Sequence, residues 1–174
     1  MVKIFKALTA GIFLITSIAT TASAISSGEE APHFKVTSGD GKVLTSDMLK
    51  GRIAVVFYET KDTKEKNRAL KDILNAFYAG KSSMEQNEIA RLAVIRCSNF
   101  FPNIWRRQLR ENSKKEGIVI YGDWDGSMEK DYGMVSDDSN FLIIDKKGIV
   151  RYVRAGAIPE KDFGSIKKII DELK

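Results

Sequence analysis

The run Ile53-Ala54-Val55-Val56-Phe57-Tyr58 decides the fold, because every one of its side chains is apolar or aromatic. Such a continuous β-branched and aromatic run is typical of a strand that is buried on both faces of a sheet. Shortly after it the chain reads Asp62-Thr63-Lys64-Glu65, and a helical pattern follows. The sequence therefore predicts a buried strand that leads through a short polar turn into a helix.

The helix is predicted over Lys64 to Ala79. Four apolar side chains within it are spaced i, i+3, i+4 and i+7, which places them on one stripe: Leu70, Ile73, Leu74 and Phe77. After a polar loop over 81–88, Leu92 to Cys97 predicts a second buried strand. Two buried strands joined through a helix form a βαβ unit, so we expect them to be parallel.

The rest of the chain predicts a hairpin at each end of the sheet and further helices. We expect strands over 33–36 and 42–44, a helix over 101–113, a strand over 118–121, a turn-rich segment over 123–133, strands over 141–144 and 149–153, and a helix from Pro159. The Gly- and Asp-containing turns within both strand pairs are typical of hairpins. This order predicts one α/β domain of three layers, with a mixed central sheet, helices on both faces and an N-terminal β-hairpin.

Residues 1–24 have the pattern of an export signal. Lys3 and Lys6 precede an apolar run centred on Ile12 to Ile15, and Ala22-Ser23-Ala24 supplies small residues for a signal peptidase. The apolar run is shorter than the roughly 20 residues that span a bilayer. We therefore predict cleavage after Ala24, a domain over 25–174 and a periplasmic location.

The composition limits the partners and the covalent chemistry. The net charge is +5, and it falls to +3 when the two lysines of the signal are removed. This mild charge and the predicted export give no support for a nucleic-acid partner. Because Cys97 is the only cysteine, no intramolecular disulfide can form.

Several local patterns resemble exported thioredoxin-like and peroxiredoxin-like proteins. They are Ala31-Pro32-His33-Phe34, Asp40-Gly41-Lys42, Leu49-Lys50-Gly51, the run from Ile53, and the segment Phe141 to Gly148. The resemblance implies a thioredoxin-like fold.

A narrower resemblance is to the YtfJ family of small exported bacterial proteins. It rests on Lys64-Glu65-Lys66-Asn67, Asp137-Asp138-Ser139 and Gly156-Ala157. That family is predicted to have a thioredoxin-like fold, also lacks the cysteine pair, and has no established biochemical role. The resemblance therefore implies a fold and an exported location, and supplies no catalytic residue.

Two landmarks of the redox-active relatives are absent. Asp62 and Glu65 stand where the resemblance places the two cysteines, and Asp138-Ser139-Asn140 stands where it places a cis-proline. The three prolines, at positions 32, 102 and 159, lie elsewhere. This pattern favours a scaffold without dithiol chemistry.

The segment Asp62 to Glu65 has two interpretations. As a capping box, Asp62 would accept from a free backbone N–H at the helix start and Glu65 would reach back, which the spacing favours. As a binding element, its charged side chains would face a ligand. The two are compatible, since a cap can also line a groove.

Cys97 lies at the C-terminal end of its predicted strand, the edge where open α/β sheets bind ligands. A buried, inert thiol is the favoured interpretation, because free cysteines are usually buried. His33 is the only histidine and is far along the chain. We interpret it as a hairpin residue, because no metal-ligand spacing surrounds it.

The densest basic patch is Trp105-Arg106-Arg107-Gln108-Leu109-Arg110. Trp105, Arg106, Arg107 and Arg110 would contact an anionic surface, with the tryptophan as an interfacial anchor. The favoured interpretation is a solvated helix face with Trp105 and Leu109, spaced i and i+4, packed inward.

No motif predicts a cofactor or a metal. Asp123, Asp125 and Glu129 only partly match a calcium loop. The glycines form no phosphate loop, and no serine lies in a nucleophile elbow.

We therefore expect an exported, redox-inactive protein with a binding or accessory role in the cell envelope. The expected groove is formed by Asp62, Thr63, Lys64, Glu65, Cys97, Asp138, Ser139 and Asn140, and its occupant would be an envelope protein or peptide. One alternative is a single-cysteine thiol oxidoreductase or peroxidase that uses Cys97. The other is a membrane-surface protein that uses the Trp105–Arg110 patch. The sequence predicts no oligomeric state.

Overall fold

The computed structural model describes residues 24–98 and 100–174. The predicted export signal, apart from Ala24, lies outside the described residues. Among those described, no helix combines the length and the apolar character that crossing a membrane requires.

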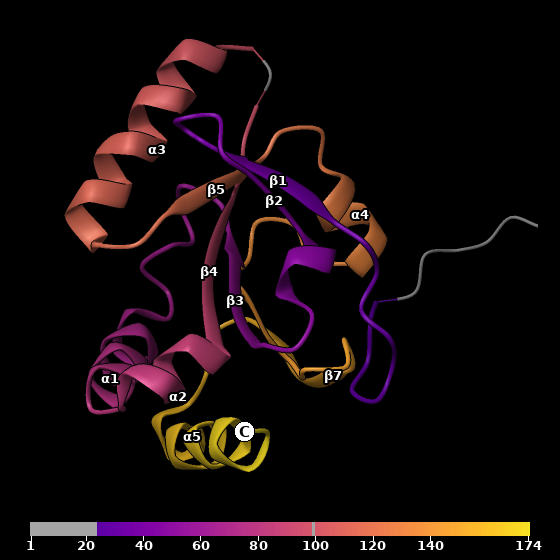
Figure 1. Ribbon diagram of the computed structural model, residues 1–174. Coiled ribbons are helices and arrows are strands. Elements are labelled where there is room, and N and C mark those ends of the chain that lie inside the picture. Colours follow the sequence, from indigo (N-terminus) through magenta and orange to yellow (C-terminus); the bar gives the residue numbers. More distant parts are fainter. Residues whose placement is uncertain (1–23, 99) are drawn as a thin grey trace, which may run out of the picture.

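Seven strands form one sheet in the order β2-β1-β5-β4-β3-β6-β7 (Figure 1). Only β3–β4 and β4–β5 are parallel pairs among the named strands, and the others are antiparallel. The bounds are β1 Lys35–Ser38, β2 Val43–Thr45, β3 Ile53–Glu59, β4 Ile89–Arg96, β5 Ile120–Asp123, β6 Asn140–Ile144 and β7 Val150–Ala155. This mixed sheet and the N-terminal hairpin confirm the predicted architecture.

The central strand β3 is buried at all seven positions, as its composition predicts. Its side chains alternate between two cores, because successive residues of a strand point to opposite faces. Ile53, Val55 and Phe57 belong to one core, and Ala54, Val56 and Tyr58 belong to the other.

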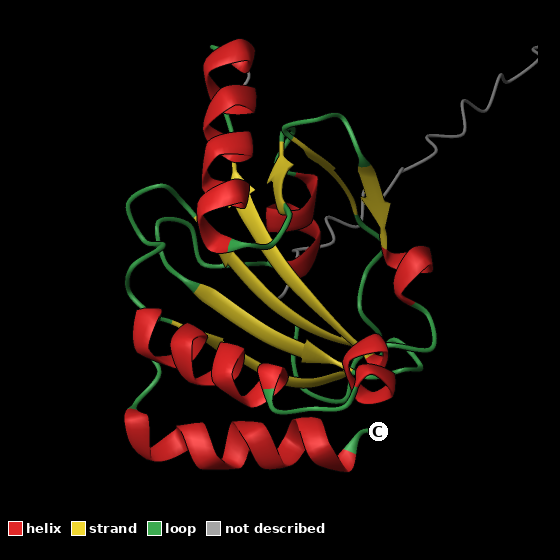
Figure 2. Ribbon diagram, turned by 60° about the vertical axis from the view of Figure 1, so that its left-hand side comes forward, coloured by secondary structure: helices red, strands yellow, loops and turns green. Residues whose placement is uncertain are grey.

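Helices cover both faces of the sheet (Figure 2). Helices α1 (Arg68–Ala79) and α5 (Phe163–Glu172) pack on the face of Val55. Helix α3 (Pro102–Glu116) packs on the same face but over β4 and β5, where its Leu109 joins Ile120. Helix α4 (Ser127–Tyr132) and the 3₁₀ turn η1 (Ser46–Leu49) cover the opposite face.

Several predicted boundaries differ from the structure. The first long helix begins at Arg68 instead of Lys64, and the second buried strand begins at Ile89 instead of Leu92. The predicted polar loop over 81–88 contains helix α2 (Ser83–Glu88), whose Ser82 and Glu85 form a reciprocal capping box. Short polar helices lack the apolar stripe on which the prediction depends.

The later elements are longer or shifted. Helix α3 extends to Glu116, and β5 covers 120–123 instead of 118–121. The turn-rich segment contains helix α4, and a 3₁₀ turn, η2 (Glu160–Asp162), separates Pro159 from α5.

Candidate functional site

The predicted site residues lie along one edge of the sheet, which we call the strand-end edge. The parallel strands β3, β4 and β5 end there, at Glu59, Arg96 and Asp123. Strand β6 runs antiparallel to β3 and begins at the same edge, with Asn140 opposite Tyr58. The topology thus brings Asp62–Glu65, Cys97 and Asp138–Asn140 to one side of the molecule.

The polar turn before α1 is fixed by hydrogen bonds within the turn and to distant segments. The Thr63 hydroxyl accepts from the backbone N–H of Thr60 at 2.9 Å. The buried amide of Asn67 donates to the Ser139 hydroxyl and to the Gly156 carbonyl, both at 2.9 Å, and accepts from the N–H of Ile158 at 2.8 Å. The turn therefore holds the loops before β6 and after β7 in place.

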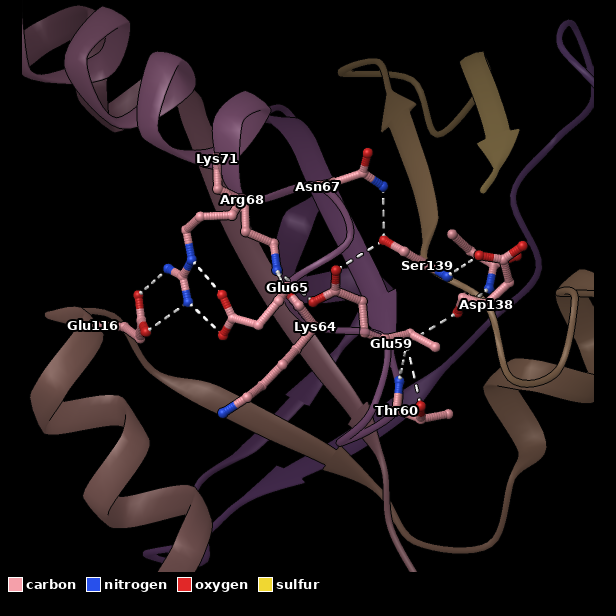
Figure 3. Close-up of polar contacts among 12 residues, drawn as sticks. Glu59, Thr60, Lys64, Glu65, Asn67, Arg68, Lys71, Glu116, Asp138 and Ser139 are labelled. Carbon is pink, nitrogen blue, oxygen red and sulfur yellow. Dashed lines mark hydrogen bonds and ion pairs between the residues drawn. The ribbon is translucent and has the colours of Figure 1, made fainter. Parts of the chain in front are cut away.

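The capping-box prediction for Asp62 and Glu65 is wrong. The N-cap of α1 is Asn67, and it makes no side-chain capping hydrogen bond. The carboxylate of Glu65 instead pairs with Arg68, which also binds Glu116 of α3 (Figure 3). The Asn67 hydrogen bonds to the rest of the fold outweigh the local cap, so the helix starts later than its sequence predicts.

A buried ion pair that sequence reasoning missed lies behind this turn. Glu59 is 2 % exposed, and its carboxylate accepts from the Lys71 ammonium at 2.6 Å and from the Ser139 hydroxyl at 2.8 Å (Figure 3). Burial raises the pKa of Glu59, and the contacts with Lys71 and Ser139 oppose that rise. The sequence feature that could have indicated this ion pair is an acidic residue, Glu59, at the end of an apolar strand.

The polar side chains of Ser139 and Asn140, in and after the loop before β6, do not line an open groove. Ser139 and Asn140 are buried, and the Asn140 side chain binds both backbone groups of Val135. Asp138 pairs with Lys66 at 2.6 Å, and this contact lowers the pKa of Asp138. Ser139 and Asn140 therefore act within the fold, which corrects their prediction as groove-lining residues.

A basin of about 540 Å³ opens at the strand-end edge. It brings Asp62 and Cys97 together with Trp105, which the sequence placed in a separate patch. Trp124, which sequence reasoning did not single out, also lines it and donates its indole N–H to the Thr37 carbonyl at 3.1 Å. The full lining is Thr60, Lys61, Asp62, Arg96, Cys97, Ser98, Phe100, Trp105, Trp124 and Asp125.

The thiol of Cys97 is buried, as predicted. The residue is 2 % exposed, and burial, with the nearby Asp123 carboxylate, raises its pKa to about 12. His33 lies near the opposite ends of the strands, where it shares a pocket with Ala54 and Ile144 and contacts Ser46. The imidazole therefore cannot act as a base for Cys97.

Structural comparison identifies the architecture. A candidate protein disulfide isomerase from Bacteroides thetaiotaomicron matches with a TM-score of 0.67 and 18% identity, covering 86% of this chain and 90% of that one. A candidate thiol:disulfide interchange protein DsbE from Chlorobium tepidum matches with a TM-score of 0.63 and 15% identity, covering 87% and 100%. A thiol peroxidase from Chromobacterium violaceum matches with a TM-score of 0.64 and 13% identity, covering 87% and 89%.

The fold is thioredoxin-like. No family model matches the sequence. A relative from Haemophilus influenzae, described as an uncharacterized protein, is 24% identical over 187 residues and covers 99% of both chains. The structural likenesses establish the thioredoxin-like fold. The biochemical role must be inferred from the chemistry of the site.

The basic patch of this thioredoxin-like domain is mostly engaged with its own neighbours. Trp105 packs toward Cys97 and Leu109, which confirms the inward-packing interpretation. The Arg106 guanidinium lies 5.2 Å from the centre of the Trp124 ring, and Arg110 donates to the Gly39 carbonyl at 3.0 Å. The alternative interpretation of Trp105 as an exposed anchor is therefore wrong, because the helix turns that face inward.

The described part of the chain holds no group of three His, Cys, Asp or Glu side chains arranged for a metal. Asp123 is buried, and its carboxylate accepts from the Tyr58 hydroxyl and from the backbone N–H groups of Gly126 and Glu129. Burial raises the pKa of Asp123. The acidic residues of this segment stabilise the turn into α4.

Proposed function

We propose that this chain is a redox-inactive thioredoxin-fold protein of the cell envelope that binds a protein segment or peptide in the strand-end basin. The YtfJ-like patterns and the predicted export signal support this assignment. The proposal extends to membership of the YtfJ family and to a periplasmic location after cleavage behind Ala24.

The proposal rests on one observation: the polar side chains of the turn that follows β3 form hydrogen bonds within the fold. Thr63 and Asn67 are buried, and their polar atoms bind the neighbouring backbone and Ser139. The chain's single thiol, on Cys97, is buried with a raised pKa. Because a thiolate is the reacting species in thiol exchange, this environment opposes redox catalysis.

The basin has the properties of a binding surface. Its volume of about 540 Å³ lies within the usual range of ligand sites. Phe100, Trp105 and Trp124 offer aromatic surface, while Lys61, Arg96, Asp62 and Asp125 offer charges of both signs. Aromatic residues and Arg are enriched at the centre of protein-recognition surfaces, and other polar and charged groups form the rim.

Insulin reduction and peroxide consumption test whether the protein lacks thiol reductase and peroxidase activity. We expect the protein and its Cys97→Ser variant to give the same background rate in both assays. A rate above background that disappears in Cys97→Ser would establish the single-cysteine enzyme instead. Capture from an envelope fraction, with Trp124→Ala as the basin variant, would then identify the partner.

A second candidate function is binding to an anionic membrane surface. The structure favours it through three exposed apolar side chains at the start of α3: Phe100, Phe101 and Ile104 are 84 %, 69 % and 46 % exposed. Arg106 and Arg107 follow on the same helix and are also exposed. Apolar side chains beside cations are the combination that binds anionic bilayers.

Liposome sedimentation tests the second candidate. We expect Phe101→Ser with Ile104→Ser to abolish binding to vesicles that contain an anionic lipid, and neutral vesicles not to bind. Unchanged binding after Arg106, Arg107 and Arg110 are replaced by Gln would exclude an electrostatic membrane contact.

A further inference from the structure

A second cavity, which shares only Lys61 and Trp105 with the basin, lies between α1 and α3. Both helices pack on the same face of the sheet but over different strands, so the middle of β4 is only partly covered (Figures 1 and 2). Ala93 and Ile95 point to this face and are half-buried. Together with Phe57 and Leu109 they line a cleft of about 130 Å³, which we call the α1–α3 cleft.

The walls of the cleft are strongly basic. Five cationic side chains line it and only two carboxylates do: Lys61, Lys64, Arg68, Lys71 and Arg91 against Glu59 and Glu116. The two carboxylates are already paired, Glu59 with Lys71 at 2.6 Å and Glu116 with Arg68 at 3.0 Å.

In the part of the chain that the structure describes, the remaining cations have no carboxylate partner. Arg91 contacts the neutral Asn75 amide at 2.8 Å and the ring of Tyr78. Within residues 24–98 and 100–174, the ion pairs of the strand-end edge include neither Lys61 nor Lys64. In Figure 3 the Lys64 side chain extends past the Arg68–Glu65 pair, and no contact joins its ammonium to the other residues drawn. The cleft therefore presents unpaired positive charge above an apolar floor.

The size of the cleft limits the ligand. An apolar cavity of about 150 Å³ holds a molecule of benzene. The α1–α3 cleft is of this order, so it accommodates one aromatic ring or a short branched chain, and no long acyl chain.

We propose that the α1–α3 cleft binds a small organic carboxylate that carries a single aromatic ring or a short branched chain. The apolar part contacts Phe57, Ala93 and Ile95, and the carboxylate pairs with Lys61 and Lys64. Charge-assisted hydrogen bonds are stronger than neutral ones. This site does not depend on the proposed partner binding in the basin.

The test is a titration of the protein with three probes that share one ring and differ in charge: 3-phenylpropionate, 3-phenylpropanol and 3-phenylpropylamine. Backbone amide shifts in ¹H–¹⁵N spectra locate each probe. Ala93 and Asn112 line only the cleft, whereas Trp124 and Asp125 line only the basin. We expect saturable shifts at Ala93 and Asn112 with the carboxylate, about tenfold weaker binding of the alcohol, and no saturable binding of the amine.

Two variants test the residues. Lys61→Gln with Lys64→Gln should weaken carboxylate binding about tenfold, whereas Lys167→Gln with Lys168→Gln on α5 should leave it unchanged. Ala93→Phe should fill the cleft and abolish binding. Because the lysine variants change partly exposed side chains, they decide the question even if Ala93→Phe does not fold.

Three results would overturn the proposal. Equal binding of the three probes would show that the lysine charges do not contribute to binding. Shifts confined to Trp124 and Asp125 would place the ligand in the basin. No saturable shift with any probe would show that the cleft binds no ligand of this class. The first and third results would leave partner binding in the basin untouched, and the capture experiment addresses that binding directly.

Discussion

At the residue scale, buried polar side chains at the strand-end edge form hydrogen bonds and ion pairs with one another. Glu59 ends β3 within a hydrophobic layer, so its carboxylate needs both the Lys71 ammonium and the Ser139 hydroxyl. Lys71 also donates to the Lys64 carbonyl at 2.6 Å, which ties α1 to the preceding turn. Removing one partner of such a pair costs more than the pair contributes, because the remaining charge stays buried.

Lys71→Met should therefore lower the free energy of unfolding at pH 7 by about 3 kcal/mol. Burial already raises the pKa of Glu59 above its ordinary value of 4.5, and loss of the ammonium raises it further. The folded variant then keeps a proton that the unfolded chain releases, so its stability falls as pH rises above about 4.5. Urea unfolding at pH 4.5 and pH 7 measures this: the deficit relative to the unsubstituted protein should be larger at pH 7.

The control is Lys168→Met on the exposed face of α5, whose ion pair with Glu172 is at the surface. Its stability should change little at either pH. If Lys71→Met lowers the free energy of unfolding equally at both pH values, Glu59 does not titrate in this range.

Cys97 should react slowly in the folded protein. Its pKa is raised to about 12, so at pH 8 very little thiolate forms, and the sulfur is also shielded from reagent. We expect iodoacetamide to alkylate the native protein at least about tenfold more slowly than the urea-unfolded chain. Equal rates would contradict the buried thiol and restore Cys97 as a reactive residue.

At the scale of elements, the start of α1 is decided by contacts with other parts of the chain. Residues 61–67 form turns, and Asn67 connects them to the loops that precede β6 and follow β7. The capping box that is present in the described residues belongs to α2, where Ser82 faces solvent and Glu85 completes the cap although it also pairs with Lys174 at 2.7 Å. Local capping signals are therefore followed where the helix end is exposed and overridden where it is buried.

Asn67→Ala should destabilise the fold by about 2–3 kcal/mol. It leaves the buried N–H of Ile158 and the carbonyl of Gly156 without their partner, and unsatisfied buried groups cost this order of free energy. Asn75→Ala, on the exposed face of the same helix, is the matched control and should cost well under half as much. Chemical unfolding measures both, and equal losses would show that Asn67 contributes only helix propensity.

At the scale of the whole molecule, stability is concentrated in the middle of the sheet. Strands β3 and β6 have neighbours on both sides and contribute buried side chains to the cores on both faces, whereas β2 and β7 are the edges. Helix α3 contributes few buried side chains, with Leu109 the buried one within it. Regions with fewer buried contacts open more readily than the core.

Hydrogen exchange should reflect this arrangement. We expect the amides of β3 and β6 to exchange only on global unfolding, and those of β2 and the first turn of α3 to exchange at least about a hundredfold faster through local opening. Mass spectrometry of peptic fragments after labelling measures the difference. Protection of the whole of α3 as strong as that of β3 would contradict the local opening of this helix.

The sequence by itself determined the α/β class, the mixed sheet and the inward packing of Trp105 and Leu109. Those features follow from apolar periodicity, which reports burial directly because the period of a strand or helix fixes which side chains share a face. The order of elements also determined which edge of the sheet would carry the candidate residues, because parallel strands end at the same edge.

Only the tertiary structure decided the roles of the polar residues. Sequence spacing assigned Asp62 and Glu65 to a cap, yet Glu65 pairs with Arg68, and Arg68 reaches Glu116 in another helix. The Glu59–Lys71 pair, the Asn67 links, and the meeting of Cys97 with Trp105 and Trp124 join residues whose proximity depends on how the layers pack. A polar side chain takes whichever partner burial brings within hydrogen-bond distance, and that choice is made by packing across the fold and not by neighbours along the chain.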